Sequence, residues 1–141
     1  MEHAQQTFKL SVPSSTVNLK MIRDFVEDSA RRSALAEDAM SKLALAVDEA
    51  CANVIEHAYN NDDTRELTVH IWFDNRQIEV DVIDSGSPFD PGSHKPLRIE
   101  DLIGHTGGMG IRIMRMATDE LVADTDERGH NRLRLIKRFS S

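Results

Sequence analysis

The sequence is poor in cysteine, in long apolar runs and in signals for export. Cys51 is the only cysteine among 141 residues, so no internal disulfide can form, and its apolar neighbours favour a buried small side chain over a reactive thiol. The apolar runs fall far short of the roughly 18 residues that a membrane-spanning helix needs. Residues 1–6 have neither the basic nor the apolar stretch of a secretion signal. We therefore expect a cytoplasmic protein without membrane contact.

Positive charge is also scarce, since 24 acidic residues stand against 17 basic ones and the net charge is −7. Sequence-independent nucleic-acid binders gain most of their affinity when Lys and Arg neutralise phosphates. The charge therefore argues against direct nucleic-acid binding and favours protein and small-molecule partners. The six histidines lack His-x-x-x-His spacing, so no structural zinc is predicted. One basic run is interpreted as an exposed strand face rather than a binding patch: Arg132, Arg134, Lys137 and Arg138.

The apolar pattern of the chain, 1–141, predicts a single α+β domain. We expect strands at 7–12, 67–73, 77–83, 120–124 and 131–139, and helices at about 17–33, 40–59 and 110–117. Residues 74–76 are short enough for an antiparallel hairpin, and residues 60–62 should end the second helix as a turn. Because the strands are grouped, we expect a two-layer sandwich with helices on one face of a mixed, mostly antiparallel sheet.

A polar stripe on the second helix is the first candidate site. Glu49, Asn53 and His57 are four residues apart and share one helix face. This spacing fits a solvent-facing edge, or a metal and proton-transfer site. In the second case the Asn53 carbonyl can hold Mg²⁺ beside ATP phosphates, Glu49 can accept a hydroxyl proton, and His57 can orient a phosphate. Asp48 points about 100° around the helix from Glu49 and is given no catalytic role.

A second candidate site follows the strand that ends near residue 83. The carboxylate of Asp84 can accept the exocyclic amino group of adenine, and Gly86 lets the ring approach the backbone. The same Asp-Ser-Gly fragment is also a common turn at a strand end. Residues 87–106 contain three of the four prolines and are expected to form a long functional loop with one helical turn near 99–102.

A glycine cluster opens the third expected helix, at Gly107, Gly108, Met109 and Gly110. Glycines free backbone N–H groups, and a helix N-terminus carries partial positive charge, so the cluster suits either polyphosphate or a tight turn. No Gly-Lys-Ser/Thr follows, so the segment is not a P-loop.

Taken in this order, the three segments resemble the N, G1 and G2 boxes of the GHKL (Bergerat-fold) ATPases over residues 46–114. Within that superfamily, DEACANVIEHAY at 48–59, Pro-Phe-Asp-Pro at 88–91 and Gly-Gly-Met-Gly-Ile at 107–111 are similar to the anti-sigma-factor serine/threonine-protein kinase branch. The resemblance implies a histidine-kinase-like ATPase domain that uses ATP and Mg²⁺. It also implies that the protein phosphorylates an anti-sigma-factor antagonist and binds a sigma factor, with family precedent for a homodimer.

The resemblance also implies roles for individual residues. Glu49 would be the base, Asn53 the Mg²⁺ ligand, and Asp84 with Gly86 the adenine site. Gly108 and Gly110 would flank the phosphates, and His57, Gly107 and Met109 would complete the nucleotide site. Residues 87–106 would be the ATP lid, in which four side chains can meet phosphates or a partner: His94, Lys95, Arg98 and His105. Such kinases commonly carry Thr near the start of the last strand, where this chain has Asn131 and Arg132.

Three other functions remain to be separated from the kinase. An ATP-gated binding module without phosphoryl transfer would use the same nucleotide site to set partner affinity. The catalytic domain of a histidine kinase fits less well, because no helical pair with a phosphoacceptor His precedes residue 7. An ATP-driven clamp such as a topoisomerase or chaperone would need transducer domains in addition.

Overall fold

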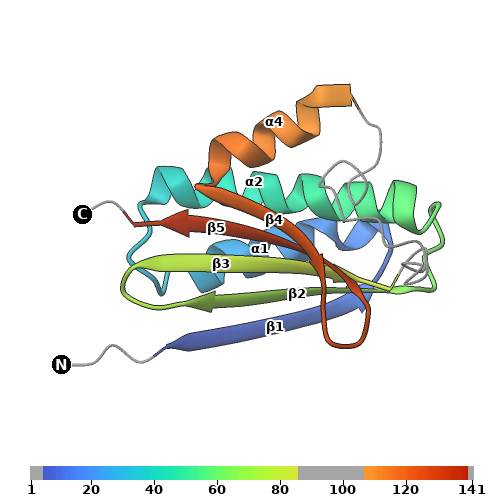
Figure 1. Ribbon diagram of the computed structural model, residues 1–141, viewed down its shortest axis with the longest axis horizontal. Helices are drawn as coiled ribbons and strands as arrows, with labels where there is room; N and C mark the ends of the chain where they lie inside the picture. The colour runs from blue at the N-terminus through green and yellow to red at the C-terminus, as the bar shows by residue number, and fades with distance from the viewer. Residues whose placement is uncertain (1–4, 86–106, 140–141) are drawn as a thin grey trace.

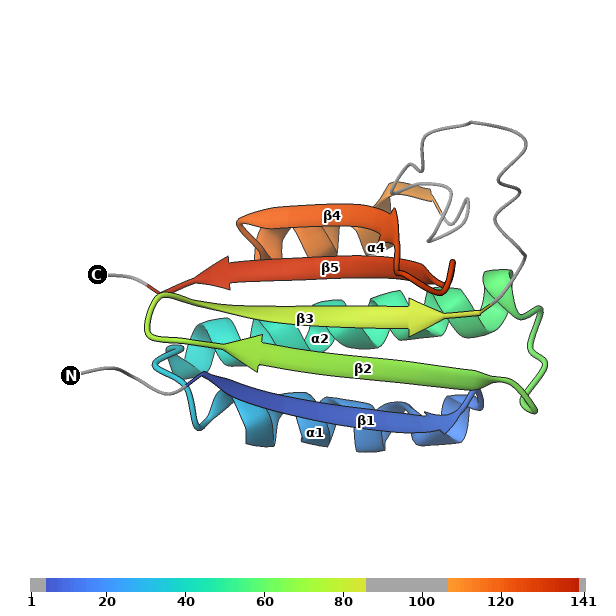
Figure 2. The same cartoon turned by 60° about the horizontal axis from the view of Figure 1, so that its bottom comes forward.

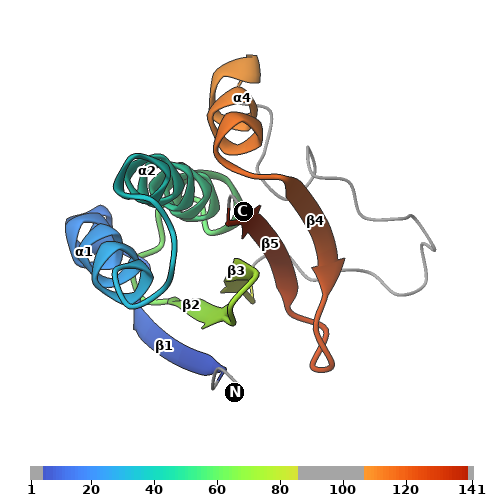
Figure 3. The same ribbon diagram turned by 90° about the vertical axis from the view of Figure 1, so that its left-hand side faces the viewer.

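The computed structural model describes residues 5–85 and 107–139, with the backbone alone for 107–109. One five-stranded sheet has the strand order β1-β2-β3-β5-β4. The strands are β1 (Gln6–Pro13), β2 (Glu66–Phe73), β3 (Gln77–Asp84), β4 (Glu120–Thr125) and β5 (Asn131–Arg138). The helices are α1 (Leu19–Ala30), α2 (Glu37–Asn53) and α4 (Gly107–Ala117), with the short turns η1 (Thr16–Asn18) and η2 (Val54–Ala58). Helices α1 and α2 lie against one face of the sheet and α4 lies beside α2, which confirms the two-layer α+β sandwich (Figures 1 and 3).

All four strand pairings in the described part of the chain are antiparallel. The expectation of a mixed sheet is therefore wrong for the described strands, whose neighbours are all antiparallel. Strands β3 and β4 both run antiparallel to β5, so they run in the same direction with β5 between them. After β3 the chain thus skips one position in the sheet before it forms β4, and the last strand, β5, occupies that position.

Alternation along the strands places apolar side chains on the helix-covered face. In β2, Leu67, Val69, Ile71 and Phe73 are buried, whereas the residues between them are partly exposed. The same core takes in Cys51 of α2, which is fully buried as expected. Burial, and then the negative charge of Asp48, raise the pKa of the Cys51 thiol, so it remains protonated and unreactive.

The opposite face of the sheet carries paired charges. Arg134 of β5 donates two hydrogen bonds to Asp81 of β3, at 2.8 and 3.0 Å, and Arg132 donates two to Asp124 of β4, at 2.8 and 2.9 Å. The remaining basic residues of the run are also paired, Lys137 with Asp119 and Arg138 with Glu120. Arg132, Arg134 and Arg138 thus share this face, whereas Lys137 stands opposite the buried Ile78 and lies on the other face. Of the four residues only Arg138 is exposed, so the expected exposed strand face is observed only in part.

Several helix boundaries differ from those expected, since α1 ends at Ala30 rather than near residue 33 and α2 begins at Glu37 rather than near residue 40. The second helix is α-helical only to Asn53 and continues as a π-helical turn, η2, in which the Tyr59 N–H bonds to the Val54 carbonyl five residues back. It ends at Asn60 and Asn61, whose φ angles of 49° and 62° are left-handed, a conformation that Asn tolerates. Helix α4 begins at Gly107 rather than Gly110, so the glycine cluster forms its first turn. Of the helices in the described ranges, none has the length and apolar character to cross a membrane.

Candidate functional site

Three segments far apart in sequence end at the same side of the molecule. The C-terminal end of α2, the C-terminal end of β3 and the N-terminal end of α4 all point toward the same end of the molecule in both views (Figures 1 and 2). These are the segments that carry Glu49 and Asn53, Asp84, and the glycine cluster. The fold therefore gathers the sequence motifs at one end of the sandwich.

Glu49 and Asn53 both face Gly110, where α4 packs across α2. A Cβ atom at Gly110 would lie 3.1 Å from both Cγ and Oε1 of Glu49, and 3.4 Å from Nδ2 of Asn53. The absence of a side chain at Gly110 thus allows the two helices to approach closely at this point. As a result, a carboxylate and a carboxamide from adjacent turns of α2 meet the first turn of α4.

The carboxamide of Asn53 is buried beside Gly110. The residue is 2% exposed, and its Nδ2 has no hydrogen-bond partner within residues 5–85 and 107–139. Leaving a buried polar group unsatisfied costs roughly 1–3 kcal/mol, and such groups in folded proteins call for an explanation such as a bound ligand. A half-turn about the Cβ–Cγ bond exchanges the two ends of the amide. Asn53 can therefore offer an N–H to a phosphate oxygen or a carbonyl oxygen to a cation.

His57 lies apart from this pair. It belongs to η2, beyond the point where the α-helical spacing of the stripe ends, and its side chain is exposed. Its Nε2 is 3.8 Å from the carboxylate of Glu56. Asp48, adjacent to Glu49, instead accepts a hydrogen bond from Arg23 of α1 at 3.3 Å and so links the two helices.

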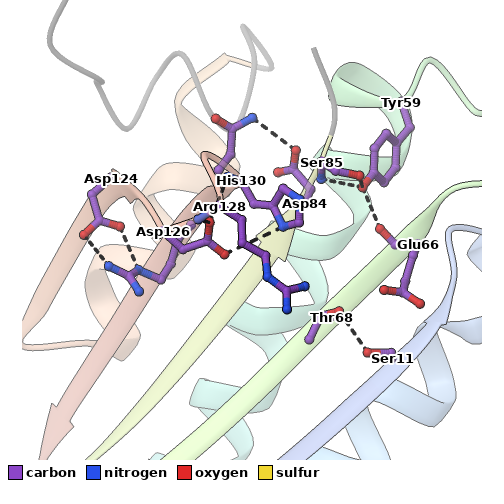
Figure 4. Close-up of polar contacts among 12 residues, drawn as sticks. Ser11, Tyr59, Glu66, Thr68, Asp84, Ser85, Asp124, Asp126, Arg128 and His130 are labelled. Atoms are coloured by element: carbon purple, nitrogen blue, oxygen red, sulfur yellow. Dashed lines mark hydrogen bonds and ion pairs between the residues drawn. The ribbon is translucent and has the colours of Figure 1, made fainter. Parts of the chain in front are cut away.

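Asp84 is a buried carboxylate at the end of β3, on the face of the sheet covered by helices. Only 4% of the residue is exposed, and Asn131, its cross-strand neighbour in β5, donates from Nδ2 to Oδ1 of Asp84 at 3.2 Å (Figure 4). Asn131 thus provides a polar contact at the strand position where a Thr was expected from the resemblance. An ionised carboxylate has several lone pairs and can accept more than one hydrogen bond, so Asp84 can also serve as an acceptor for a donor group of a ligand.

The glycine cluster supplies backbone donors rather than side chains. Since α4 begins at Gly107, the N–H groups of residues 107–110 belong to its first turn, where α-helical N–H groups have no partner within the helix. The positive end of the helix dipole lies at the same place. Gly86, the expected lid at 87–106 and its four side chains, His94, Lys95, Arg98 and His105, lie outside the described residues.

Sequence reasoning missed the contacts around Ser85, the residue that follows Asp84. Its N–H donates to the hydroxyl of Tyr59 and its carbonyl accepts from Arg65. Tyr59 is the last residue of the expected helix and of the 48–59 motif, and nothing in its spacing indicates a contact 26 residues away. The turn before β5 is also held by one side chain, since Asp126 accepts from the N–H groups of Arg128 and His130 (Figure 4).

Comparison with known proteins now identifies the family. Residues 12–137 match the family of histidine kinase-like ATPase domains. The chain belongs to that family. The resemblance to the GHKL ATPases drawn from the three sequence segments is therefore confirmed.

Individual relatives are similar over most of their length. The serine-protein kinase RsbW of Halalkalibacterium halodurans is 29% identical over 132 residues, covering 88% of this chain and 79% of the relative. The proteins of the same name from Bacillus licheniformis and Bacillus subtilis are each 28% identical, over 133 and 128 residues. These alignments cover 89% and 86% of this chain, and 82% and 79% of the respective relatives.

Proposed function

We propose that the protein is an ATP- and Mg²⁺-dependent serine/threonine-protein kinase. Its substrate would be an anti-sigma-factor antagonist, and it would also bind a sigma factor. The observation that carries the proposal is the convergence of Glu49 and Asn53, whose buried Nδ2 has no hydrogen-bond partner among the described residues, on the glycine-bearing first turn of α4. The family match and the relatives named serine-protein kinase support it.

The residues present fit a nucleotide and a divalent cation. Asn53 would hold the cation or a phosphate through its carboxamide, and the backbone of Gly107, Gly108, Met109 and Gly110 would face the phosphates. Asp84 would accept the adenine amino group, with Gly86 beside the ring. Mg-ATP supplies the transferable phosphoryl group and the cation that neutralises charge on its oxygens.

Glu49 would act as the general base. Its carboxylate lies one helical turn before Asn53, so it is close to the groups assigned to the phosphates and can accept the proton of a serine or threonine hydroxyl. Asp48 is the adjacent carboxylate, but it is engaged with Arg23. The exposed His57 would contribute to phosphate binding only from the edge of the site.

The assignment of Glu49 can be tested by separating binding from transfer. Glu49→Gln keeps the size of the side chain beside Gly110 but removes the base. We expect this variant to bind ATP like the wild type and to phosphorylate the antagonist about 10² to 10⁴ times more slowly, measured by phosphate transfer to serine or threonine. Asp48→Asn is the matched control, since it neutralises the neighbouring carboxylate and should retain transfer.

The alternative function is an ATP-gated binding switch. If Glu49→Gln regulates its partner as the wild type does, and no phosphoserine or phosphothreonine forms in any reaction, phosphoryl transfer is refuted and the switch is supported. Capture of a sigma factor with and without ATP, from the cytoplasm where we propose the protein acts, would test the second partner. Sedimentation of the purified protein would test for a homodimer.

A further inference from the structure

Tyr59 links the start of β2 to the end of β3, next to Asp84. Its phenolic oxygen accepts a hydrogen bond from the N–H of Ser85 at 2.8 Å and donates one to the carbonyl of Glu66 at 2.6 Å (Figure 4). The Tyr59 residue is only 3% exposed. A buried hydroxyl that uses both its donor and its acceptor capacity in this way is well fixed in position.

The hydroxyl lies where the ladder between β2 and β3 would otherwise continue. The last residues paired in that ladder are Leu67 and Asp84, so Glu66 and Ser85 are the next opposed residues. Their backbone groups are bridged by the hydroxyl of Tyr59. The phenol therefore takes the place of the next ladder hydrogen bond, at the point where β3 ends.

Arg65 holds the other backbone group of Ser85. Its guanidinium lies over the ring of Tyr59, 4.9 Å from the ring centroid, and donates a hydrogen bond to the Ser85 carbonyl. The N–H and the carbonyl of Ser85 are thus each held by a different side chain. Both side chains come from the segment between η2 and β2.

Tyr59 also connects the two halves of the candidate site. It follows η2 directly, and its own N–H bonds to the carbonyl of Val54, the residue after Asn53. Its ring therefore extends from the end of the helix that carries Asn53 to the end of the strand that carries Asp84. Changing the contact at either end would change the spacing between the groups assigned to phosphate and to adenine.

We propose that Tyr59, supported by Arg65, is a positioning residue of the nucleotide site. It would set the distance and orientation of Asp84 relative to Asn53 without touching the nucleotide itself. This inference rests on the proposed function, because it assigns Asp84 and Asn53 to opposite ends of one bound nucleotide.

Tyr59→Phe is the direct test, since it removes the bridging hydroxyl and keeps the ring. Arg65→Met is a second variant, which removes the hydrogen bond to Ser85 at an exposed position and should not prevent folding. The matched control is Ile78→Val, a buried change near the opposite end of β3 that loses one methyl group from the core. All three are made in the full chain and compared with the wild type.

Two readouts distinguish positioning from general stability. Calorimetry with ADP should show a dissociation constant about three- to tenfold higher for Tyr59→Phe, a smaller rise for Arg65→Met, and less than a twofold change for Ile78→Val. Amide hydrogen exchange without nucleotide should be faster at Ser85 in Tyr59→Phe and unchanged there in Ile78→Val.

The possible failures are distinguishable. If the wild type binds ADP and Tyr59→Phe binds it within twofold as tightly, Tyr59 does not position the site. Equal exchange at Ser85 in the wild type and Tyr59→Phe would likewise overturn the inference. If the wild type itself binds no ADP, the proposed function fails, and the role of Tyr59 in a nucleotide site fails with it.

Discussion

Replacing Gly110 by alanine adds one methyl group where α4 meets α2. The new carbon would lie 3.1 Å from Cγ and Oε1 of Glu49 and 3.4 Å from Nδ2 of Asn53. Overpacking typically costs about 1–3 kcal/mol, whereas alanine in place of glycine within a helix contributes about 0.5–1 kcal/mol. We therefore expect Gly110→Ala to lower the free energy of unfolding by between about zero and 2.5 kcal/mol.

The effect of the same substitution on the free energy of unfolding should have the opposite sign when Glu49 is replaced by alanine. Glu49→Ala removes both atoms that a Cβ at Gly110 would approach at 3.1 Å, and of the three nearest atoms it leaves Nδ2 of Asn53, an ordinary contact at 3.4 Å. In that background Gly110→Ala should raise the free energy of unfolding by about 0.5–1 kcal/mol. Because the helix-propensity contribution is the same in both backgrounds, they would differ by a coupling energy equal to the overpacking cost, about 1–3 kcal/mol, which is within the range for residues in contact.

Urea denaturation of the four proteins, followed by far-ultraviolet circular dichroism, measures this coupling. The slopes of the four transitions should agree, so that differences in midpoint report stability. Gly110→Ala should also weaken ADP binding, because the methyl group displaces the Glu49 carboxylate and faces the Asn53 amide. An equal effect of Gly110→Ala in both backgrounds would refute the close approach of Glu49 to α4.

Three further predictions concern other parts of the molecule. Asp84→Asn should weaken ADP binding by about tenfold or more in calorimetry, because the amide that replaces the carboxylate loses a charged acceptor; unchanged affinity would remove Asp84 from the adenine role. Arg134→Met should lower the free energy of unfolding in urea by roughly 2–4 kcal/mol, since it strands the buried carboxylate of Asp81, whereas Arg132→Met, whose partner is more exposed, should cost less than about 1 kcal/mol. Equal losses of unfolding free energy in the two variants would show that the cost of removing the arginine does not depend on how deeply its aspartate partner is buried. Cys51 should react with a thiol reagent at pH 8 only after denaturant is added, because burial raises its pKa; rapid labelling of the native protein would contradict this.

Most of the fold could be predicted because its strands have a clear period of two. Alternating burial in β2, and the short link between β2 and β3, are direct consequences of the side-chain pattern. The start of α4 could not be predicted from the side-chain pattern, because Gly107 and Gly108 have no side chains to contribute to it and have low helix propensity. In the fold, contact between α4 and α2 at Gly110 compensates for that propensity.

The candidate site was predictable in its residue types but not in its contacts. The four-residue spacing of Glu49 and Asn53 placed both on one helix face, and both do face α4. The same spacing extended the stripe to His57, where a π-helical turn changes the periodicity. The bridging role of Tyr59 depends on long-range packing against the end of β3, which no local pattern encodes.

The central claim is that this chain binds Mg-ATP at the site formed by α2, β3 and α4. Isothermal titration calorimetry of the wild-type protein with ATP tests it most directly, with and without Mg²⁺ in otherwise identical buffer. We predict saturable binding of one nucleotide per chain, with a lower affinity when Mg²⁺ is removed. Absence of saturable binding at millimolar ATP in the presence of Mg²⁺ would contradict the account.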